Sequence, residues 1–277
     1  MNAASFLVCT SFFPTEVRLP HQIGMLKAIS EWPVASVRVV LMTFADNDVI
    51  EKVSKVFEIF NSSILSIEFY KVNKYDDGYM LTWEHKDLIK SRFLAISSRY
   101  THFLYTEDDL QISWRNVAYW IKFREELDFS RLLPGMLRYE IARGDIWATD
   151  VSEPQKLDGR CSIHRSGLRF VNVWPPYQAL LLLDRQLAEE HIQSRSFDFE
   201  NSKYYGHYGT PERASMGPTW ENAPLEMGFS SRYVIPVGSD NLPHFDCMVH
   251  HLPNTYASSQ DVARTLCGTL RIKDLFY

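Results

Sequence analysis

Three consecutive carboxylates, Glu107, Asp108 and Asp109, close the apolar segment THFLYTEDD at residues 101–109. Like charges side by side repel one another, so this cluster predicts a partner of opposite charge. Side chains alternate along an extended segment, which would put Glu107 and Asp109 on one face and Asp108 on the other. Two carboxylates on one face suit Mg²⁺ or Mn²⁺, which keeps positions for water or phosphate oxygens. We predict Glu107 and Asp109 as metal ligands; the alternative is that Asp108 or Asp109 caps the next helix.

The elements that precede this acidic triplet place it at the edge of a sheet. Helical patterns alternate with apolar runs that predict buried strands. The strands are expected at residues 5–13, 37–44, 63–72 and 101–109, and the helices at 21–32, 47–60 and 81–100. Such an alternation predicts a mainly parallel sheet covered on both faces. Ligands of such sheets bind outside the carboxyl ends of the strands, where the triplet lies.

The rest of the chain has a less regular pattern. Ser113 is expected to cap a helix over residues 114–127. A strand or hairpin at 133–151, a strand at 167–173, a long helix starting near Pro176, and a short helix around 211–215 are expected to follow. We predict one compact α/β domain, with a nucleotide-type half at 1–112 and an irregular half at 113–277.

Composition excludes several classes of protein. The 277 residues are 45% hydrophobic and 14% aromatic, enough for a large core. A net charge of -5 offers no uniform basic field, so a nucleic-acid partner is not expected. The four cysteines show no CxxC spacing, and no apolar run reaches the ~18–20 residues that span a bilayer. We expect a cytoplasmic protein whose contact with a membrane is at most peripheral.

A strand that ends in a DXD-like acidic motif after two βα units resembles the GT-A glycosyltransferases. Glu107-Asp108-Asp109 matches that motif with Glu in the first place, and the resemblance covers the architecture of about the first 150 residues. It implies a GT-A type α/β fold and a metal-dependent transferase that uses a nucleotide-diphosphate sugar. UDP is favoured as the commoner donor nucleotide. The implied acceptor is a hydroxyl of a glycan or lipid-linked glycan, as in surface polysaccharide synthesis.

The resemblance also implies residues that contact the donor. Thr10, at the end of the first strand, and Asp46, after the second, are expected at the nucleotide, together with Asp108. Asp46 lies in FADND, which also fits a plain turn with Asp48 as the cap. His85 and Lys86, in the helix before the triplet, are expected to face the nucleotide sugar and offset the charge of its diphosphate; a solvated helix face is the alternative.

GT-A enzymes commonly take one more metal ligand from a histidine near the C-terminus. His250 and His251 would face opposite ways on an extended segment, so one of them would serve. We favour His251, which directly precedes the LPN loop. A structural role is the alternative for either histidine.

An inverting transfer, favoured here over a retaining one, needs a carboxylate to deprotonate the acceptor hydroxyl. Glu212, in the first turn of the short helix after Pro211, is the predicted base. Its competitors are Glu140, Asp150, Glu221 and Glu226, and the alternative for Glu212 is a stabiliser of the first helical turn. Tyr177 and Trp220 are candidates for stacking on acceptor sugar rings.

Four other functions are alternatives to the transferase. A sugar-phosphate nucleotidyltransferase also uses acidic metal ligands, but the first strand leads into CTSFFPTEVRLP rather than a glycine-rich, basic loop. An iron oxygenase would use His244 and Asp246 but lacks a histidine well downstream. A serine hydrolase lacks GxSxG. A non-catalytic carbohydrate-binding protein on the same fold stays open, and a UDP titration with and without Mn²⁺ separates it from the transferase.

Overall fold

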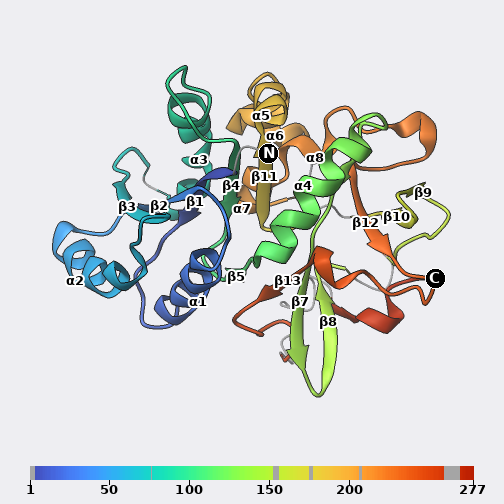
Figure 1. Ribbon diagram of the computed structural model, residues 1–277, viewed down its shortest axis with the longest axis horizontal. Coiled ribbons are helices and arrows are strands. Elements are labelled where there is room, and N and C mark those ends of the chain that lie inside the picture. The colour runs from blue at the N-terminus through green and yellow to red at the C-terminus, as the bar shows by residue number, and fades with distance from the viewer. Residues whose placement is uncertain (1–3, 76, 152–155, 175–176, 206–207, 259–268) are drawn as a thin grey trace. The chain divides into compact units, whose positions relative to one another are not determined.

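The computed structural model describes the chain except residues 1–3, 76, 152–155, 175–176, 206–207 and 259–268. The protein is a mixed α/β structure that divides into two units (Figure 1). The first unit comprises Met1–Asp109 and Ala179–Pro218, and the second comprises Leu110–Gln178 and Thr219–Tyr277. The chain passes from the first unit to the second after Asp109 and returns to the first unit at Ala179.

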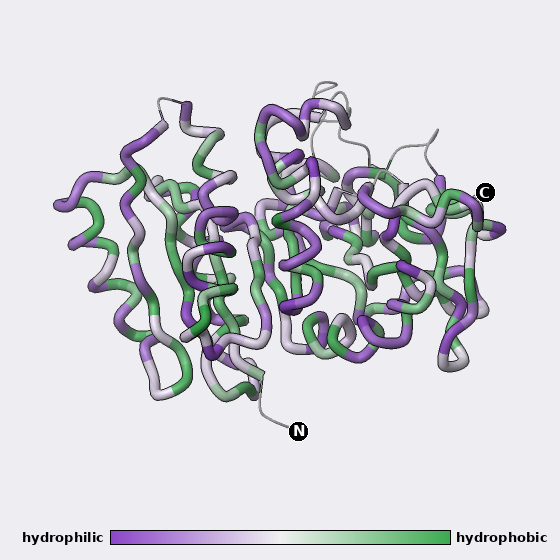
Figure 2. Tube along the Cα trace, turned by 90° about the horizontal axis from the view of Figure 1, so that it is seen from above, coloured by the Kyte–Doolittle hydropathy of each residue, from purple (hydrophilic) through white to green (hydrophobic). Residues whose placement is uncertain are grey.

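Among the described residues of the first unit, five strands form one sheet in the order β11-β4-β1-β2-β3. Four of them are parallel and β11 is antiparallel to β4, so the predicted mainly parallel sheet is confirmed. The strands are β1 Ser5–Ser11, β2 Ser36–Thr43, β3 Leu65–Lys71, β4 His102–Thr106 and β11 Leu180–Asp184. Every residue of β1 is buried, which means that both faces of the sheet are covered. Figure 2 shows hydrophobic residues running along these strands.

Three helices of the first unit connect strands of this sheet, and the other three described helices follow β11. They are α1 Leu19–Ser30, α2 Asn47–Phe57, α3 His85–Leu88, α5 Arg185–Ile192, α6 Phe199–Ser202 and α7 Thr210–Ser215. Right-handed crossovers from β1 to β2 and from β2 to β3 place α1 and α2 on one face. The connection from β3 to β4 runs the opposite way, which places α3 on the other face. Strand order therefore reverses between β1 and β4, at the switch point where such sheets bind ligands.

Two predicted helices of this unit differ from the structure. The helix expected over 81–100 is a 3-10 turn at Gly78–Trp83, then α3, then a π turn that ends at Phe93. The long helix expected from Pro176 is instead strand β11 followed by α5. The apolar run LLLLD fits either element by periodicity, and pairing with β4 decides for the strand.

The second unit holds two further sheets among its described residues, ordered β6-β12-β10-β9 and β14-β8-β7-β13-β5. Its strands are β5 Leu110–Gln111, β6 Leu133–Pro134, β7 Leu137–Ala142, β8 Asp145–Thr149, β9 Ser162–Arg165, β10 Leu168–Asn172, β12 Tyr233–Val237, β13 Met248–His251 and β14 Thr269–Arg271. The predicted hairpin is β7 and β8, which pair antiparallel. Helix α4, Trp114–Asp128, begins after Ser113, whose side chain accepts from the Asn116 amide and confirms the predicted cap. The four-residue helix α8, Gly217–Trp220, spans the boundary between the units.

No helix in the described part of the chain combines the length and the apolar character that a membrane span requires.

Candidate functional site

A pocket of about 450 Å³ lies at the carboxyl ends of β1 and β4, entirely within the first unit. Three carboxylates line it, those of Asp77, Glu107 and Asp108, together with one guanidinium, that of Arg18. Phe13 and Tyr79 supply aromatic walls. The pocket therefore sits where strand order reverses, and its lining carries more negative than positive groups.

The acidic triplet is not extended. Strand β4 ends at Thr106, and Asp108 and Asp109 form a turn before β5. The alternation argument for a face shared by Glu107 and Asp109 therefore does not apply, because alternation requires continuous strand geometry. Glu107 and Asp108 line the pocket. The amide of Glu107 still donates to the Ala179 carbonyl at 3.0 Å, so the chain turns away from β4 only after residue 107.

Asp108 is the most confined carboxylate of the pocket, with 1% of its surface exposed. Its Oδ1 accepts from Arg18 Nη1 at 2.5 Å, whereas its buried Oδ2 has no hydrogen-bond partner among the described residues. Burial and the neighbouring Asp109 charge raise the pKa of Asp108 to about 8, although Arg18 lowers it. A buried carboxylate oxygen without a donor is costly, which points to a ligand that completes the site.

Arg18 and the residues around Asp77 were not predicted as site residues. Arg18 directly precedes α1, 90 residues away from Asp108 in the chain. Asp77 accepts from the Tyr79 amide at 2.9 Å, which fixes the loop that follows β3. The rule that located the triplet, that ligands gather after the ends of parallel strands, applies equally to Phe13 after β1 and to Asp77 after β3.

The other predicted donor-binding residues lie outside the lining of this pocket. Thr10 is fully buried within β1, and its neighbour Ser11 lines the pocket instead. Asp46 is the residue before α2, and its side chain is 92% exposed and 3.9 Å from Lys71. His85 is fully buried and stacks on Tyr105 at 4.1 Å between ring centroids. Their roles stay predictions, without support from the pocket.

Lys86 lies in a different pocket, described below. Thr82, one helical turn before it, lines the pocket of the triplet. The helical segment therefore reaches the pocket of the triplet through Thr82, and the predicted role of Lys86 at the diphosphate stays a prediction.

Glu212 is in the first turn of α7, as predicted, and follows Pro211, which lines the pocket. Its carboxylate folds back over the start of its own helix, because a Cβ atom at Gly209 would lie 2.5 Å from Glu212 Oε2. That oxygen is buried without a hydrogen-bond partner among the described residues. Glu212 is thus near the pocket in sequence but does not line it, and its catalytic role stays a prediction.

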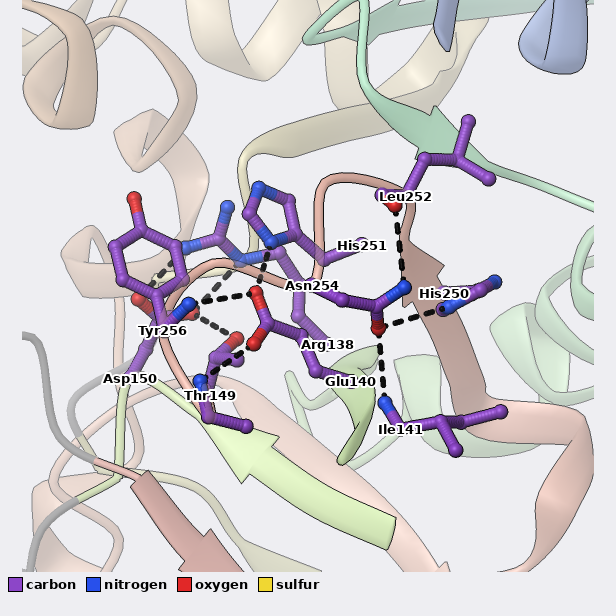
Figure 3. A network of polar contacts seen from close by, with 11 residues as sticks. Arg138, Glu140, Ile141, Thr149, Asp150, His250, His251, Leu252, Asn254 and Tyr256 are labelled. Atoms are coloured by element: carbon purple, nitrogen blue, oxygen red, sulfur yellow. Dashed lines mark hydrogen bonds and ion pairs between the residues drawn. The ribbon is translucent and has the colours of Figure 1, made fainter. Parts of the chain in front are cut away.

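His251 belongs to the second unit, where it is part of a buried polar network around Glu140 (Figure 3). Its Nδ1 contacts Glu140 Oε1 at 2.5 Å, and Glu140 also accepts from the amides of Tyr256 and Ala257 at 3.2 and 2.6 Å. Histidines that bind metals commonly donate their other ring nitrogen to a carboxylate. The contact is compatible with a metal on Nε2 and equally with a structural role, so the predicted ligation stays a prediction.

The competitors of Glu212 lie in the second unit and have partners there. Glu140 is bound by His251 as above, and Asp150 accepts two hydrogen bonds from Arg138 at 2.6 and 2.7 Å. Glu226 forms an ion pair with Arg131. Glu221 belongs to the same unit, as do Tyr177, whose ring lies 4.8 Å from the Arg138 guanidinium, and Trp220.

No protein-family model matches this chain, and no curated protein matches it. Two solved structures of S. aureus TarS, one of them residues 1–349 in complex with UDP-GlcNAc, are each 12% identical at a TM-score of 0.31. Each match covers 48% of this chain, and it spans 21% of one TarS chain and 35% of the other. A likeness of this size carries no argument about the activity of this chain.

Proposed function

We propose that the chain is a glycosyltransferase whose first unit binds the diphosphate of a nucleotide-sugar donor in the pocket at β1 and β4. One observation carries the proposal. Asp108 is buried at the switch point of a parallel sheet with an oxygen that has no hydrogen-bond partner among the described residues. A fold gains nothing from such a group, whereas a cation-binding site needs it.

A divalent cation fits the charges of the pocket. Three carboxylates and one guanidinium would repel a diphosphate, unless a cation lies between the two sets of oxygens. Within the described ranges no three His, Cys, Asp or Glu side chains form a cage, so Glu107 and Asp108 would share the ion with phosphate oxygens and water. Asp109 and His251 stay further proposed ligands. Mn²⁺ or Mg²⁺ bound there supplies a Lewis acid that neutralises the charge of the departing diphosphate.

The chain's own residues would position the donor. Arg18, 44% exposed at its side chain, can turn from Asp108 toward a phosphate while keeping its charge. Phe13 and Tyr79 offer ring faces for a base or a sugar. In the transfer, the bond from the anomeric carbon to the phosphate oxygen breaks and its electron pair leaves with the diphosphate. The acceptor oxygen forms the new bond, and in the inverting mode Glu212 takes its proton.

The test is equilibrium binding of UDP and GDP to the whole chain, with Mn²⁺ and with EDTA. We expect Mn²⁺ to strengthen nucleotide binding at least tenfold, because the ion removes the repulsion between diphosphate and carboxylates. Glu107→Gln should lose most of that gain, and Glu31→Gln, an exposed carboxylate outside the pocket lining, should keep it. Donor hydrolysis or transfer then measures activity. Nucleotide binding that is absent, or unchanged by Mn²⁺ and by Glu107→Gln, contradicts the proposal.

A further inference from the structure

A second pocket of the first unit, of about 370 Å³, lies beside α3 and the segment at residues 192–199. Four aromatic side chains line it: Tyr75, Trp83, Phe197 and Phe199. Lys86 and Lys90 line it as well. Aromatic walls with a few polar groups are typical of ligand sites of this size.

Lys86 is 3% exposed, which is rare for a lysine unless a carboxylate accompanies it. Its Nζ donates to the Ser196 carbonyl at 2.7 Å and lies 3.4 Å from His191 Nε2. It also lies 4.4 Å from the centroid of the Trp83 ring. Within the described part of the chain, no carboxylate lies within salt-bridge distance of this amine. Burial lowers the pKa of Lys86 well below its ordinary value, although the charge of Asp198 raises it.

Lys90 places a second amine beside the same aromatic ring. The amines of Lys86 and Lys90 lie 5.3 and 4.5 Å from the centroid of one ring, that of Phe197. The carboxylates that line the pocket have other partners: Asp87 pairs with Lys74, and Asp198 accepts from the Asn201 amide at 2.9 Å. In the described part of the chain neither of these carboxylates forms an ion pair with Lys86 or Lys90, so an anionic ligand could pair with both amines.

The position of Lys86 is fixed by its neighbours. His191 is buried and packs so closely against Gly217 that a Cβ atom at that glycine would lie 2.2 Å from His191 Cε1. His191 Nδ1 lies 3.2 Å from Ser194 Oγ, and Ser194 is itself part of the pocket lining. Because these contacts already restrict the Lys86 amine, it loses little conformational entropy when it binds a ligand, which favours affinity.

We propose that this pocket binds a sugar that carries one anionic group, a carboxylate or a phosphate. The anion contacts the amines of Lys86 and Lys90, and the sugar ring lies against the aromatic walls. Charge-assisted hydrogen bonds supply the specificity for the anion, and the apolar C–H faces of the sugar pack on the aromatic rings. The inference goes beyond the proposed transfer reaction, because it uses none of the residues of the nucleotide pocket.

The test is calorimetric titration of the whole chain with methyl β-D-glucuronide and with glucose 6-phosphate, which separate carboxylate from phosphate. Methyl β-D-glucoside and acetate are the controls that lack the anion and the ring, respectively. We expect one or both charged sugars to bind at least tenfold more tightly than either control. Equal binding of glucoside or acetate, or no binding of either charged sugar, overturns the proposal.

Substitutions of the two lysines test whether the charged sugar binds in this pocket. Lys86→Met should weaken it about tenfold or more, and Lys90→Ala severalfold, whereas Lys52→Ala on the exposed face of α2 should leave it unchanged. Lys90 is exposed, so its variant gives a result even if Lys86→Met does not fold. Unchanged affinity in Lys90→Ala, or displacement of the sugar by UDP with Mn²⁺, overturns the assignment. These readouts need no transferase activity, so they stand if the nucleotide proposal fails.

Discussion

Asp108→Asn is expected to lower the proposed transferase activity at least a hundredfold and, at the same time, to make the protein more stable at neutral pH. The folded-state pKa of Asp108 is about 8 and the ordinary value in an unfolded chain is about 3.9. Between those values the folded state holds a proton that the unfolded state has released, so stability falls as pH rises. Each pH unit in that window costs up to about 1.4 kcal/mol. Asparagine does not ionise, and it removes this cost.

The measurement is thermal unfolding of wild type and Asp108→Asn from pH 5 to 8, beside a transfer assay. The variant should gain about 5 °C in Tm near pH 7.5 and show a flatter dependence on pH. Glu31→Gln serves as the matched control, since it removes an exposed carboxylate. If the Asp108 carboxylate instead stabilised the fold, the result would be the opposite: Asp108→Asn would have a lower Tm than wild type, and the pH dependence would stay intact. That result would remove the argument for a ligand at Asp108.

Glu140→Ala is expected to cost about 3–5 kcal/mol of the free energy of unfolding, because it leaves buried donors without their acceptor. Glu140 is fully buried and accepts from His251 and from the amides of Tyr256 and Ala257. Burial raises the pKa of Glu140, but these hydrogen bonds outweigh it and hold the pKa below its ordinary value. The stabilisation is therefore present above about pH 4.3 and is lost as pH falls below it.

Denaturant unfolding with a probe in the second unit measures this effect. Glu125→Ala, on the exposed face of α4, is the control and should stay within about 0.5 kcal/mol of wild type. Glu140→Gln keeps the shape and one acceptor, so it should fall between the two and lose the acid dependence. If Glu140→Ala unfolds within about 1 kcal/mol of wild type, the network does not hold the second unit together. His251 would then be the more credible as a ligand-binding residue.

The sequence predicted the regular part of the first unit well. The largely buried strands β1, β2 and β4 have mostly apolar runs, and α1 and α2 have the helical period, so local pattern and tertiary environment agree. The cap at Ser113 follows from a local hydrogen bond within one turn. The placement of the triplet at the carboxyl end of β4 is also correct, because it follows from topology alone.

What the sequence did not predict depends on contacts between distant segments. Arg18 pairs with Asp108 although the two residues are 90 positions apart in the chain. No rule based on the spacing of residues in the sequence predicts such a pair. The turn at Asp108 and Asp109 exists because the chain leaves the sheet there, which a DXD-like pattern does not reveal. Lys86 was expected to serve the diphosphate, but a helix pattern without its neighbours cannot tell which side of the segment meets which pocket.

β11, which completes the sheet of the first unit, is synthesised late. It pairs with β4 at the edge of the sheet, but about 70 residues of the second unit are synthesised between these two strands. In a fragment that stops at residue 112, β4 would be an exposed edge strand. Its unpaired amide and carbonyl groups could form hydrogen bonds with a strand of a second molecule. Truncation after the acidic turn should therefore yield aggregates, and nascent chains should need shielding until residue 184 has emerged.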